Sequence, residues 1–262
     1  DADSTCWGTR LAHAVGQGAS APAARAAAAL AEHQCPGGGF ATYHTDGPIR
    51  AMIRAGPEVS FRGWCGAHGC VTAAVAGVPE RAADACRHLR ATQRADGSWD
   101  GYWWSEPEYA TALAAEALAR AAAPGDTERV ARAATWAMGR QHPAGFVATD
   151  DLPAGSPFAT ALCLRVLWAA EDGEAVERAV AAAVAWLWFS QRGDGGWRAS
   201  ARLRVPWPHD DRPEQFRDWV RGGLGEGALI VDQNAAFTTA TVLGALGRLI
   251  AAAEPAAGET AP

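Results

Sequence analysis

The strongest constraint on the fold is a short segment that recurs four times: a glutamine, a Gly-rich turn and an aromatic residue. Residues 191–197 and 93–99 place Gln and Trp six positions apart, with Asp-Gly between them. Residues 34–40 keep this spacing with Phe in place of Trp, and residues 141–146 form a copy one residue shorter. The copies begin roughly 50–60 residues apart, a period that fits two helices and two loops.

Each copy lies between two segments with helical patterns, and Ala-rich composition favours helix throughout. The predicted helices before the copies are amphipathic and span residues 22–34, 79–93, 126–141 and 174–191. The predicted helices after them are more apolar and span about 63–77, 106–122, 156–170 and 232–252. A first helix is expected at about 5–16. Because no segment alternates strictly with period two, we expect almost no sheet.

The glutamine and the aromatic residue of each copy have a local structural role. The glutamine amide can hydrogen-bond the backbone at a neighbouring helix end, while the aromatic ring covers it. Glycine supplies the positive φ that the turn requires. The repeat therefore specifies architecture, and its aromatic residues are expected outside the active cavity.

Composition excludes several classes of function. The net charge is -6 and the basic residues are scattered, so there is no basic face for nucleic acid. No apolar run is long enough to span a membrane, and no signal peptide is recognisable. The six irregularly spaced cysteines are expected as buried free thiols in a reducing cytoplasm. The twelve tryptophans fit either core packing or an aromatic-lined cavity.

These repeats resemble the QW motifs of squalene-hopene and oxidosqualene cyclases, in order and over nearly the whole chain. The chain looks like the C-terminal half of a squalene-hopene cyclase, the domain that carries the protonating acid. The resemblance implies an all-α fold, an α/α toroid of about ten helices forming a single domain over residues 1–262. Because the chain starts at the acid motif, it is either a minimal cyclase or lacks upstream sequence, a second domain or a partner chain.

The opening segment Asp1-Ala2-Asp3-Ser4-Thr5 resembles the class II signature Asp-x-Asp-Asp-Thr. The resemblance implies that Asp3 is the general acid and that Asp1 is its helper. Ser4 stands in place of the last Asp, which points to altered control of acidity or an altered substrate. Helix capping is the structural alternative for the whole segment Asp1-Ala2-Asp3-Ser4, because Asp and Ser before an apolar run are ordinary N-caps, and the two interpretations are compatible.

Other segments carry the family's remaining site residues. The resemblance implies that Tyr109 supports the acid and that Trp103, Tyr43 and Phe237 line the substrate cavity. Trp64 is added as a further aromatic wall. Two departures from the family are His44, where Asp is common, and Ala74, where a supporting His is expected.

Such residues suit protonation of an unactivated alkene. Apolar walls keep a carboxylic acid protonated, since burial disfavours its anion. Aromatic faces stabilise the carbocation that follows. The predicted function is a class II terpene cyclase, an isomerase acting on a linear isoprenoid or polyene substrate. No cofactor or metal is expected, except Mg²⁺ if the substrate carries a diphosphate. Arg50, Arg54 and Arg62 are candidates to bind a diphosphate, and the alternative is that they are ordinary surface arginines.

Two other functions remain open from the residues. A non-catalytic repeat scaffold would bind an apolar ligand or partner. A zinc prenyltransferase-like enzyme would use Cys65, His68 and Cys70, which otherwise are packing residues, with Cys70 near the acid. Asp150 and Asp151 fit either a metal-binding pair or a turn.

The segment 205–230 is longer than most connections. It is expected to cover the cavity or to contact a membrane surface or a partner. The chain is expected in the cytoplasm, with peripheral membrane contact as an option.

Overall fold

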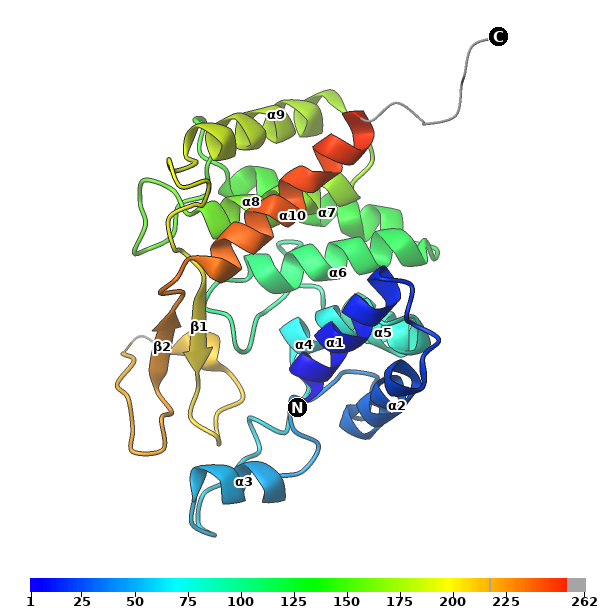
Figure 1. Ribbon diagram of the computed structural model, residues 1–262, viewed down its shortest axis with the longest axis vertical. Coiled ribbons are helices and arrows are strands. Elements are labelled where there is room, and N and C mark those ends of the chain that lie inside the picture. The colour runs from blue at the N-terminus through cyan, green and yellow to red at the C-terminus, as the bar shows by residue number, and fades with distance from the viewer. Residues whose placement is uncertain (217, 254–262) are drawn as a thin grey trace.

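The computed structural model describes residues 1–216 and 218–253, which form ten α-helices and one two-stranded hairpin (Figure 1). Arg217, inside the predicted 205–230 segment, and the residues after 253 lie outside this description. Five helices form an inner layer: α1 (Ala2–Ala14), α4 (Gly69–Val75), α6 (Glu108–Ala121), α8 (Pro157–Ala169) and α10 (Ala236–Ala253). Four form an outer layer: α2 (Ala21–Leu30), α5 (Ala82–Thr92), α7 (Asp126–Arg140) and α9 (Glu174–Phe189).

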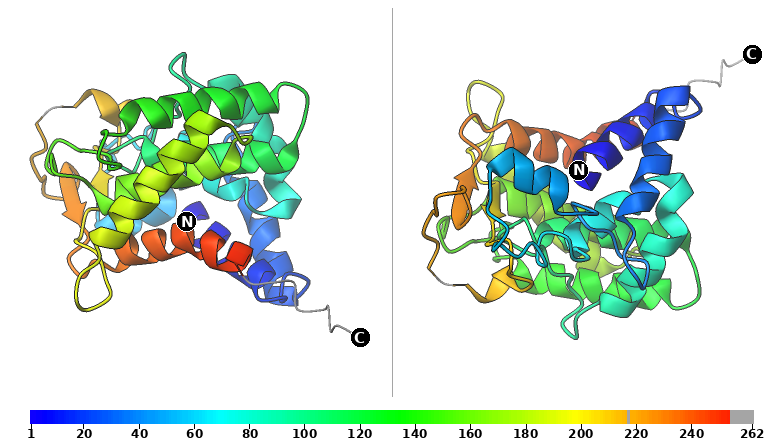
Figure 2. Two further views of the ribbon diagram at one scale, coloured as in Figure 1. Left: turned by 90° about the horizontal axis from the view of Figure 1, so that it is seen from above. Right: turned by 90° about the horizontal axis from the view of Figure 1, so that it is seen from below.

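The inner helices pack in series, α1 on α4, α4 on α6, α6 on α8 and α8 on α10. The outer helices cover them: α2 packs on α1, α5 on α4 and α6, α7 on α6 and α8, and α9 on α8 (Figure 2). Residues 70–75 and 108–118 are buried on every side, whereas α5 and α7 bury one face only. This difference explains why the segments after the repeats are more apolar than those before them.

The predicted helices are close to those observed, with two differences of substance. The helix predicted at 63–77 begins only at Gly69, because His68 before it is extended, with φ -112° and ψ 128°. The amides of Gly63 and Trp64 donate to the carbonyl of Pro208, at 2.8 and 3.3 Å. A short helix that the sequence did not predict, α3 (Gly47–Ile53), ends at Arg54, whose φ is 58°. Three short 3-10 helices complete the helical elements described: Ala31–His33, Pro79–Arg81 and Pro213–Gln215.

Within the described residues, the sheet consists of one small two-stranded hairpin. Strands β1 (Arg202–Val205) and β2 (Ala228–Val231) are antiparallel, from Arg202 opposite Val231 to Val205 opposite Ala228. On its other side β1 contacts the segment before α6, where the amide of Arg204 donates to the carbonyl of Trp103 at 2.7 Å. The hairpin therefore closes the predicted 205–230 segment at its base and fixes it beside residues 103–104.

The repeated glutamines make the backbone contacts that their spacing predicts. The side-chain amide of Gln93 donates to the carbonyls of Gly97 and Arg129, at 3.0 and 2.8 Å. The amide of Gln141 does the same with Gly145 and Ala179, at 3.1 and 2.9 Å. Each of these glutamines therefore joins its own turn to the next outer helix.

A hydroxyl on each following inner helix completes the repeat. The amide six residues after the glutamine donates to a threonine Oγ1 in all four copies: Phe40 to Thr72, Trp99 to Thr111, Val147 to Thr160 and Trp197 to Thr239. The copy predicted to be one residue shorter is therefore full length, with Val147 at the aromatic position. Phe146 lies half-buried instead, with its ring stacked on His142.

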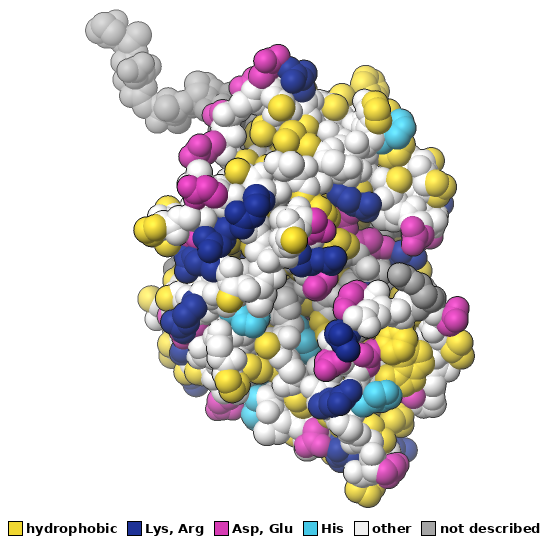
Figure 3. Space-filling model, turned by 180° about the vertical axis from the view of Figure 1, so that it is seen from behind, with side chains coloured by type: hydrophobic (Ala, Val, Ile, Leu, Met, Phe, Trp, Pro, Cys, Tyr) yellow, Lys and Arg dark blue, Asp and Glu magenta, His cyan; other side chains and the backbone are white. Residues whose placement is uncertain are grey.

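The described surface agrees with the composition. Charged side chains of both signs are interspersed on the face seen from behind (Figure 3). All six cysteines are free thiols, four of them buried, with Cys35 and Cys65 partly exposed. Among the described helices we find no segment with the length and apolar character needed to cross a membrane.

Candidate active site

Asp1 caps the first inner helix. Its carboxylate accepts from the amide of Ser4 at 2.8 Å and from the Ser4 hydroxyl at 3.3 Å. An aspartate in place of Ser4 would repel Asp1 here, whereas the hydroxyl donates to it. The capping interpretation thus holds for Asp1 and Ser4, and it leaves Asp3 for another role.

Asp3 lies in the first turn of α1 and turns toward the inner helices. Burial raises the pKa of its carboxyl above the ordinary range, and the guanidinium of Arg10 partly opposes this effect. Its electrostatic influence in turn raises the pKa of Cys6, of Cys70 on α4 and of Tyr109 on α6. Cys70 therefore does pack near Asp3, as the sequence indicated, and the carboxyl is largely withdrawn from solvent.

Tyr109 connects Asp3 to two tryptophans. Its hydroxyl accepts from the indole N–H of Trp7 at 3.2 Å, and its ring stacks on Trp104 with centroids 4.4 Å apart. Burial, and then the nearby Asp3, raises the pKa of Tyr109 well above its usual value. The phenol is therefore neutral and available to hydrogen-bond beside the acid.

Three of the predicted cavity residues form one aromatic cluster. The ring of Trp64 lies 6.0 Å from that of Tyr43 and 5.7 Å from that of Trp103, between centroids. Phe237 belongs to a second group around Trp104: its ring meets Trp104 edge-on at 6.0 Å and is 64% exposed. The four predicted wall residues therefore divide between two neighbouring clusters.

A chain of hydrogen bonds holds the indole of Trp103 in place and uses both ring nitrogens of His68. The indole of Trp103 donates to Thr42 Oγ1 at 2.6 Å, and Thr42 contacts Nδ1 of His68 at 3.0 Å. Nε2 of His68 lies 2.8 Å from the carbonyl of Gly63, which can only accept. His68 therefore donates through Nε2 and accepts through Nδ1. Burial lowers its pKa to about 4, so it is neutral.

The predicted zinc set is not assembled. Both ring nitrogens of His68 are used, and Sγ of Cys70 accepts from the amide of Tyr102 at 3.3 Å. Within residues 1–216 and 218–253 no three His, Cys, Asp or Glu side chains are grouped as metal ligands. Asp151 instead receives the hydroxyl of Thr149 at 3.0 Å in a turn, the structural alternative for that pair.

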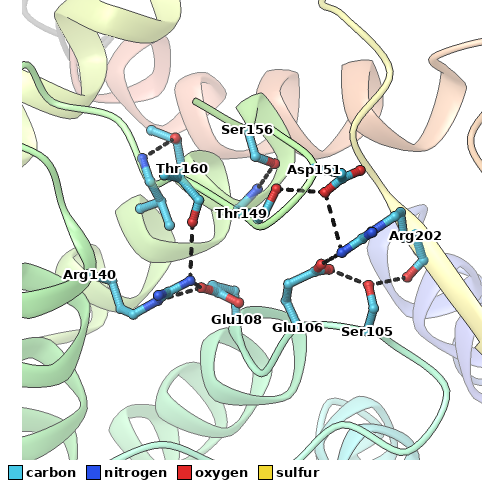
Figure 4. A network of polar contacts seen from close by, with 12 residues as sticks. Ser105, Glu106, Glu108, Arg140, Thr149, Asp151, Ser156, Thr160 and Arg202 are labelled. Atoms are coloured by element: carbon cyan, nitrogen blue, oxygen red, sulfur yellow. Dashed lines mark hydrogen bonds and ion pairs between the residues drawn. The ribbon is translucent and has the colours of Figure 1, made fainter. Parts of the chain in front are cut away.

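A polar network holds the segment before Tyr109 in place (Figure 4). Arg202 of β1 pairs with Glu106 at 2.5 Å and with Asp151 at 3.3 Å. Arg140, at the end of α7, pairs with the buried Glu108 at 2.9 Å. These ion pairs join the start of α6 to the hairpin, to the 149–152 turn and to α7, so they determine where Tyr109 lies.

Two of the three arginines predicted as diphosphate candidates bind other groups of the protein, and the third, Arg54, is exposed. Arg50 pairs with Asp46 at 2.5 Å, and its guanidinium also donates to the carbonyl of Val59 at 2.8 Å. Nε of Arg62 donates to the carbonyl of His209 at 2.7 Å. Arg50 therefore joins α3 to the segment that follows it, and Arg62 joins its own segment to His209.

Of two pockets found among the described residues, one includes predicted site residues. A pocket of about 110 Å³ is lined by Asp1, Tyr43 and their neighbours His33, His44, Thr45 and Pro48. Its volume is below the roughly 300 to 1,000 Å³ of typical small-molecule sites, so it accommodates only part of a prenyl chain. A pocket of about 390 Å³ between α4, α5 and α6 contains none of the predicted site residues.

Sequence reasoning missed three residues of this region. Trp104 follows Trp103 directly but contacts Tyr109 and Phe158, on the other side of the segment. Trp7 and Arg10 follow Asp3 by four and seven residues, the spacing of one helix face, and this spacing was the available signal.

Comparison with solved structures gives close matches. The type II terpene cyclase MstE from Scytonema, bound to its product merosterolic acid A, is 48% identical with a TM-score of 0.90. The match covers 95% of this chain and 72% of that chain. The same enzyme without ligand gives 46% identity and a TM-score of 0.91, covering 96% and 74%. Other MstE structures contain the substrate geranylgeranyl dihydroxybenzoate in variants with an aspartate or an arginine replaced.

Two further structures extend the comparison. A protein from Actinoplanes is 42% identical with a TM-score of 0.87, covering 94% of this chain and 75% of that chain. An ent-copalyl diphosphate synthase from Streptomyces platensis shares the fold alone, at 19% identity and a TM-score of 0.62, covering 94% and 41%. No protein-family profile matches the chain, and a search of curated proteins gives no match.

Proposed function

The chain belongs to the type II terpene cyclase family and is a terpene cyclase, and we propose that Asp3 is the acid that starts its reaction. The observation that carries the proposal is the position of Asp3: a half-buried residue whose carboxyl has a raised pKa and acts electrostatically on Tyr109 and Cys70. A carboxyl in that setting remains protonated at neutral pH more readily than an exposed one. The proposal includes the fold, in which the inner and outer helices form an α/α toroid and one domain.

The first step is proton transfer from Asp3 to the terminal alkene of a linear prenyl chain. The O–H bond of Asp3 breaks, a C–H bond forms at one alkene carbon, and the other carbon becomes a tertiary carbocation. A second alkene of the same chain attacks that cation and closes a ring. Loss of a proton from the last cation gives the cyclic product, so substrate and product are isomers.

Other residues take supporting roles in this proposal. Tyr109 hydrogen-bonds beside the acid and helps to restore its proton, while Asp1 maintains the helix turn that presents Asp3. Tyr43, Trp64 and Trp103 supply aromatic faces for the cations, and Phe237 with Trp104 supplies a second set. Each ring can stabilise a passing cation through its quadrupole without forming a covalent bond.

The substrate class follows from the relatives. MstE acts on a geranylgeranyl dihydroxybenzoate, a linear twenty-carbon prenyl chain on an aromatic acid. We assign a linear prenyl compound of this kind to the present chain, with prenyl diphosphates as the comparison class. Identity of 46–48% supports the same chemistry and leaves the head group to be measured.

The test compares wild type with Asp3→Asn on geranylgeranyl dihydroxybenzoate, geranylgeranyl diphosphate and farnesyl diphosphate, with and without chelator. Cyclised product that disappears in Asp3→Asn but survives chelation is the expected result. Asp1→Asn is the matched control: asparagine caps a helix as well as aspartate, so product should persist. Product from a folded Asp3→Asn protein would refute the role of Asp3, and loss in Asp1→Asn would make Asp1 a proton donor as well.

A further inference from the structure

Arg10 lies on the same face of α1 as Asp3, seven residues and two helical turns further along. Helical side chains lean toward the N-terminus, so the long arginine reaches back toward the acid. Its guanidinium carbon lies 4.2 Å from the centroid of the Trp7 ring, one turn from Asp3. The positive charge therefore lies over the Trp7 ring, on the N-terminal side of Arg10 itself.

The surrounding helices fix this guanidinium in place. Its Nη1 donates to the carbonyl of Ala74 on α4 at 3.1 Å. Gly77 leaves the room that it needs, since a Cβ at that position would lie 2.6 Å from the guanidinium carbon. Trp7, which lies against the cation, also donates to the Tyr109 hydroxyl. Arg10 is thus part of one connected group with Trp7 and Tyr109.

Within the described residues, no carboxylate lies within ion-pair distance of Arg10. Arg165, deeper in the same layer, contrasts with it, because its Nε and Nη2 donate to the two carboxylate oxygens of Glu116, at 2.9 and 2.7 Å. A partly buried cation without a partner has been taken from water without a compensating charge. Its charge acts on the groups around the acid: it opposes the rise that burial causes in the pKa of Asp3, and it also interacts with Cys6 and Tyr109.

The groups that face Asp3 from the packed helices are few. They are Cys6 and Arg10 from α1, Cys70 from α4 and Tyr109 from α6. Burial raises the pKa of Cys6 to about 12 and that of Cys70 and Tyr109 above their usual values, so all three are neutral. Arg10 is therefore the charged member of this set.

We propose that Arg10 is a positioning residue for the acid, whose held guanidinium stabilises the Asp3 carboxylate that forms as the proton leaves. This inference rests on the proposed role of Asp3. Burial alone would make Asp3 a weak acid that holds its proton, and the cation restores acid strength while the site stays closed to water. The fixed positive charge behind the acid thus stabilises the negative charge that develops on Asp3 as its proton moves to the alkene.

The test is the pH dependence of kcat for wild type, Arg10→Gln and Arg10→Lys, using the substrate that the panel identifies. Activity requires protonated Asp3, so it falls where Asp3 loses its proton as pH rises. Removing the cation raises the pKa of Asp3, and the alkaline limb moves to higher pH. Two helical turns separate the Cα atoms of Asp3 and Arg10 by about 10 Å, and a unit charge at about that distance with an effective dielectric of about 20 shifts a pKa by about one unit. We expect that shift, with kcat lowered about tenfold on the acid plateau.

Three comparisons separate the outcomes. Arg10→Lys should keep the pH midpoint of the alkaline limb within about half a pH unit of the wild-type value. Gly77→Ala, which displaces the guanidinium, should shift this midpoint part of the way toward that of Arg10→Gln. Arg25→Gln, at an exposed position on α2, should leave both rate and limb unchanged. A lower rate with an unmoved limb in folded Arg10→Gln protein would overturn the inference and reduce Arg10 to packing. Activity that survives Asp3→Asn would instead overturn the proposed acid itself.

Discussion

Replacing Thr111 by valine should remove a single hydrogen bond from the repeat while keeping the shape of the side chain. Thr111 and Trp99 are both fully buried, and the amide of Trp99 donates to the Thr111 hydroxyl at 3.0 Å. A buried amide left without an acceptor costs about 1–3 kcal/mol, and the added methyl recovers about 0.8 kcal/mol. The expected loss of folding free energy is therefore about 1 kcal/mol at the middle of that range and about 2 kcal/mol at its upper end.

The assay is guanidinium and thermal unfolding followed by circular dichroism. Unfolding entropy of about 2.1 cal/mol/K per residue gives about 2 °C per kcal/mol for a chain of this size, so Tm should fall by about 2 to 4 °C. Thr160→Val, with the same bond at 2.9 Å, should cost as much, and Thr239→Val, at 3.3 Å and partly exposed, should cost less. Thr135→Val on the exposed face of α7 is the control, expected within about 0.5 kcal/mol of wild type.

The reasoning fails if Thr111→Val is as stable as Thr135→Val. The amide of Trp99 would then have another acceptor, and the threonine of each copy would be incidental to the repeat.

Three further predictions address charge, acidity and the active site. Glu116→Gln leaves Arg165 and Arg248 without their shared carboxylate and should destabilise the fold by about 3 kcal/mol in denaturant titration; an unchanged midpoint would show that the pair is solvated. Burial lowers the pKa of His68 to about 4, so the unfolded chain binds its proton first as pH falls below about 6.5. Stability should drop by up to about 3 kcal/mol between pH 6.5 and 4, and His68→Gln should flatten that part of the profile. Trp7→Phe removes the donor to the Tyr109 hydroxyl and should lower kcat about five- to tenfold with KM within twofold; a rise in KM alone would make Trp7 a binding residue.

The parts of the fold that were predictable are those with local causes. Gln93 and Trp99 lie six residues apart, and their partners, the carbonyls of Gly97 and Leu89, belong to the same turn and the preceding helix. Sequence spacing alone therefore carries the geometry. The same spacing rule, applied to aromatic residues only, misjudged the copy at Gln141, because an apolar Val147 fills the position as well as a ring does.

The parts that were not predictable depend on distant segments. Residues 63–68 have a helical pattern, yet the carbonyl of Pro208 takes two of their amides, and nothing near Gly63 signals that partner. In the site, the roles of Asp3 and Tyr109 stay predictions, and the electrostatic influence of Asp3 on Tyr109 is consistent with them; Trp103 and Trp104 could not be told apart. Neighbouring residues of an extended segment point to opposite sides, so one indole joins His68 and the other joins Tyr109.

The inner helices have a shared orientation whose consequence is electrical. Asp3, Cys70 and Tyr109 meet near the first turns of α1, α4 and α6, so the N-termini of these helices converge on the acid. Each helix presents roughly half a positive charge at that end. The combined potential favours a carboxylate and opposes any carbocation formed beside it. A purely aliphatic pocket would leave the carbocation destabilised by this positive potential. The negative faces of the rings of Trp103, Trp104 and their neighbours therefore have to supply the compensating stabilisation. The same geometry that strengthens the acid therefore requires an aromatic wall.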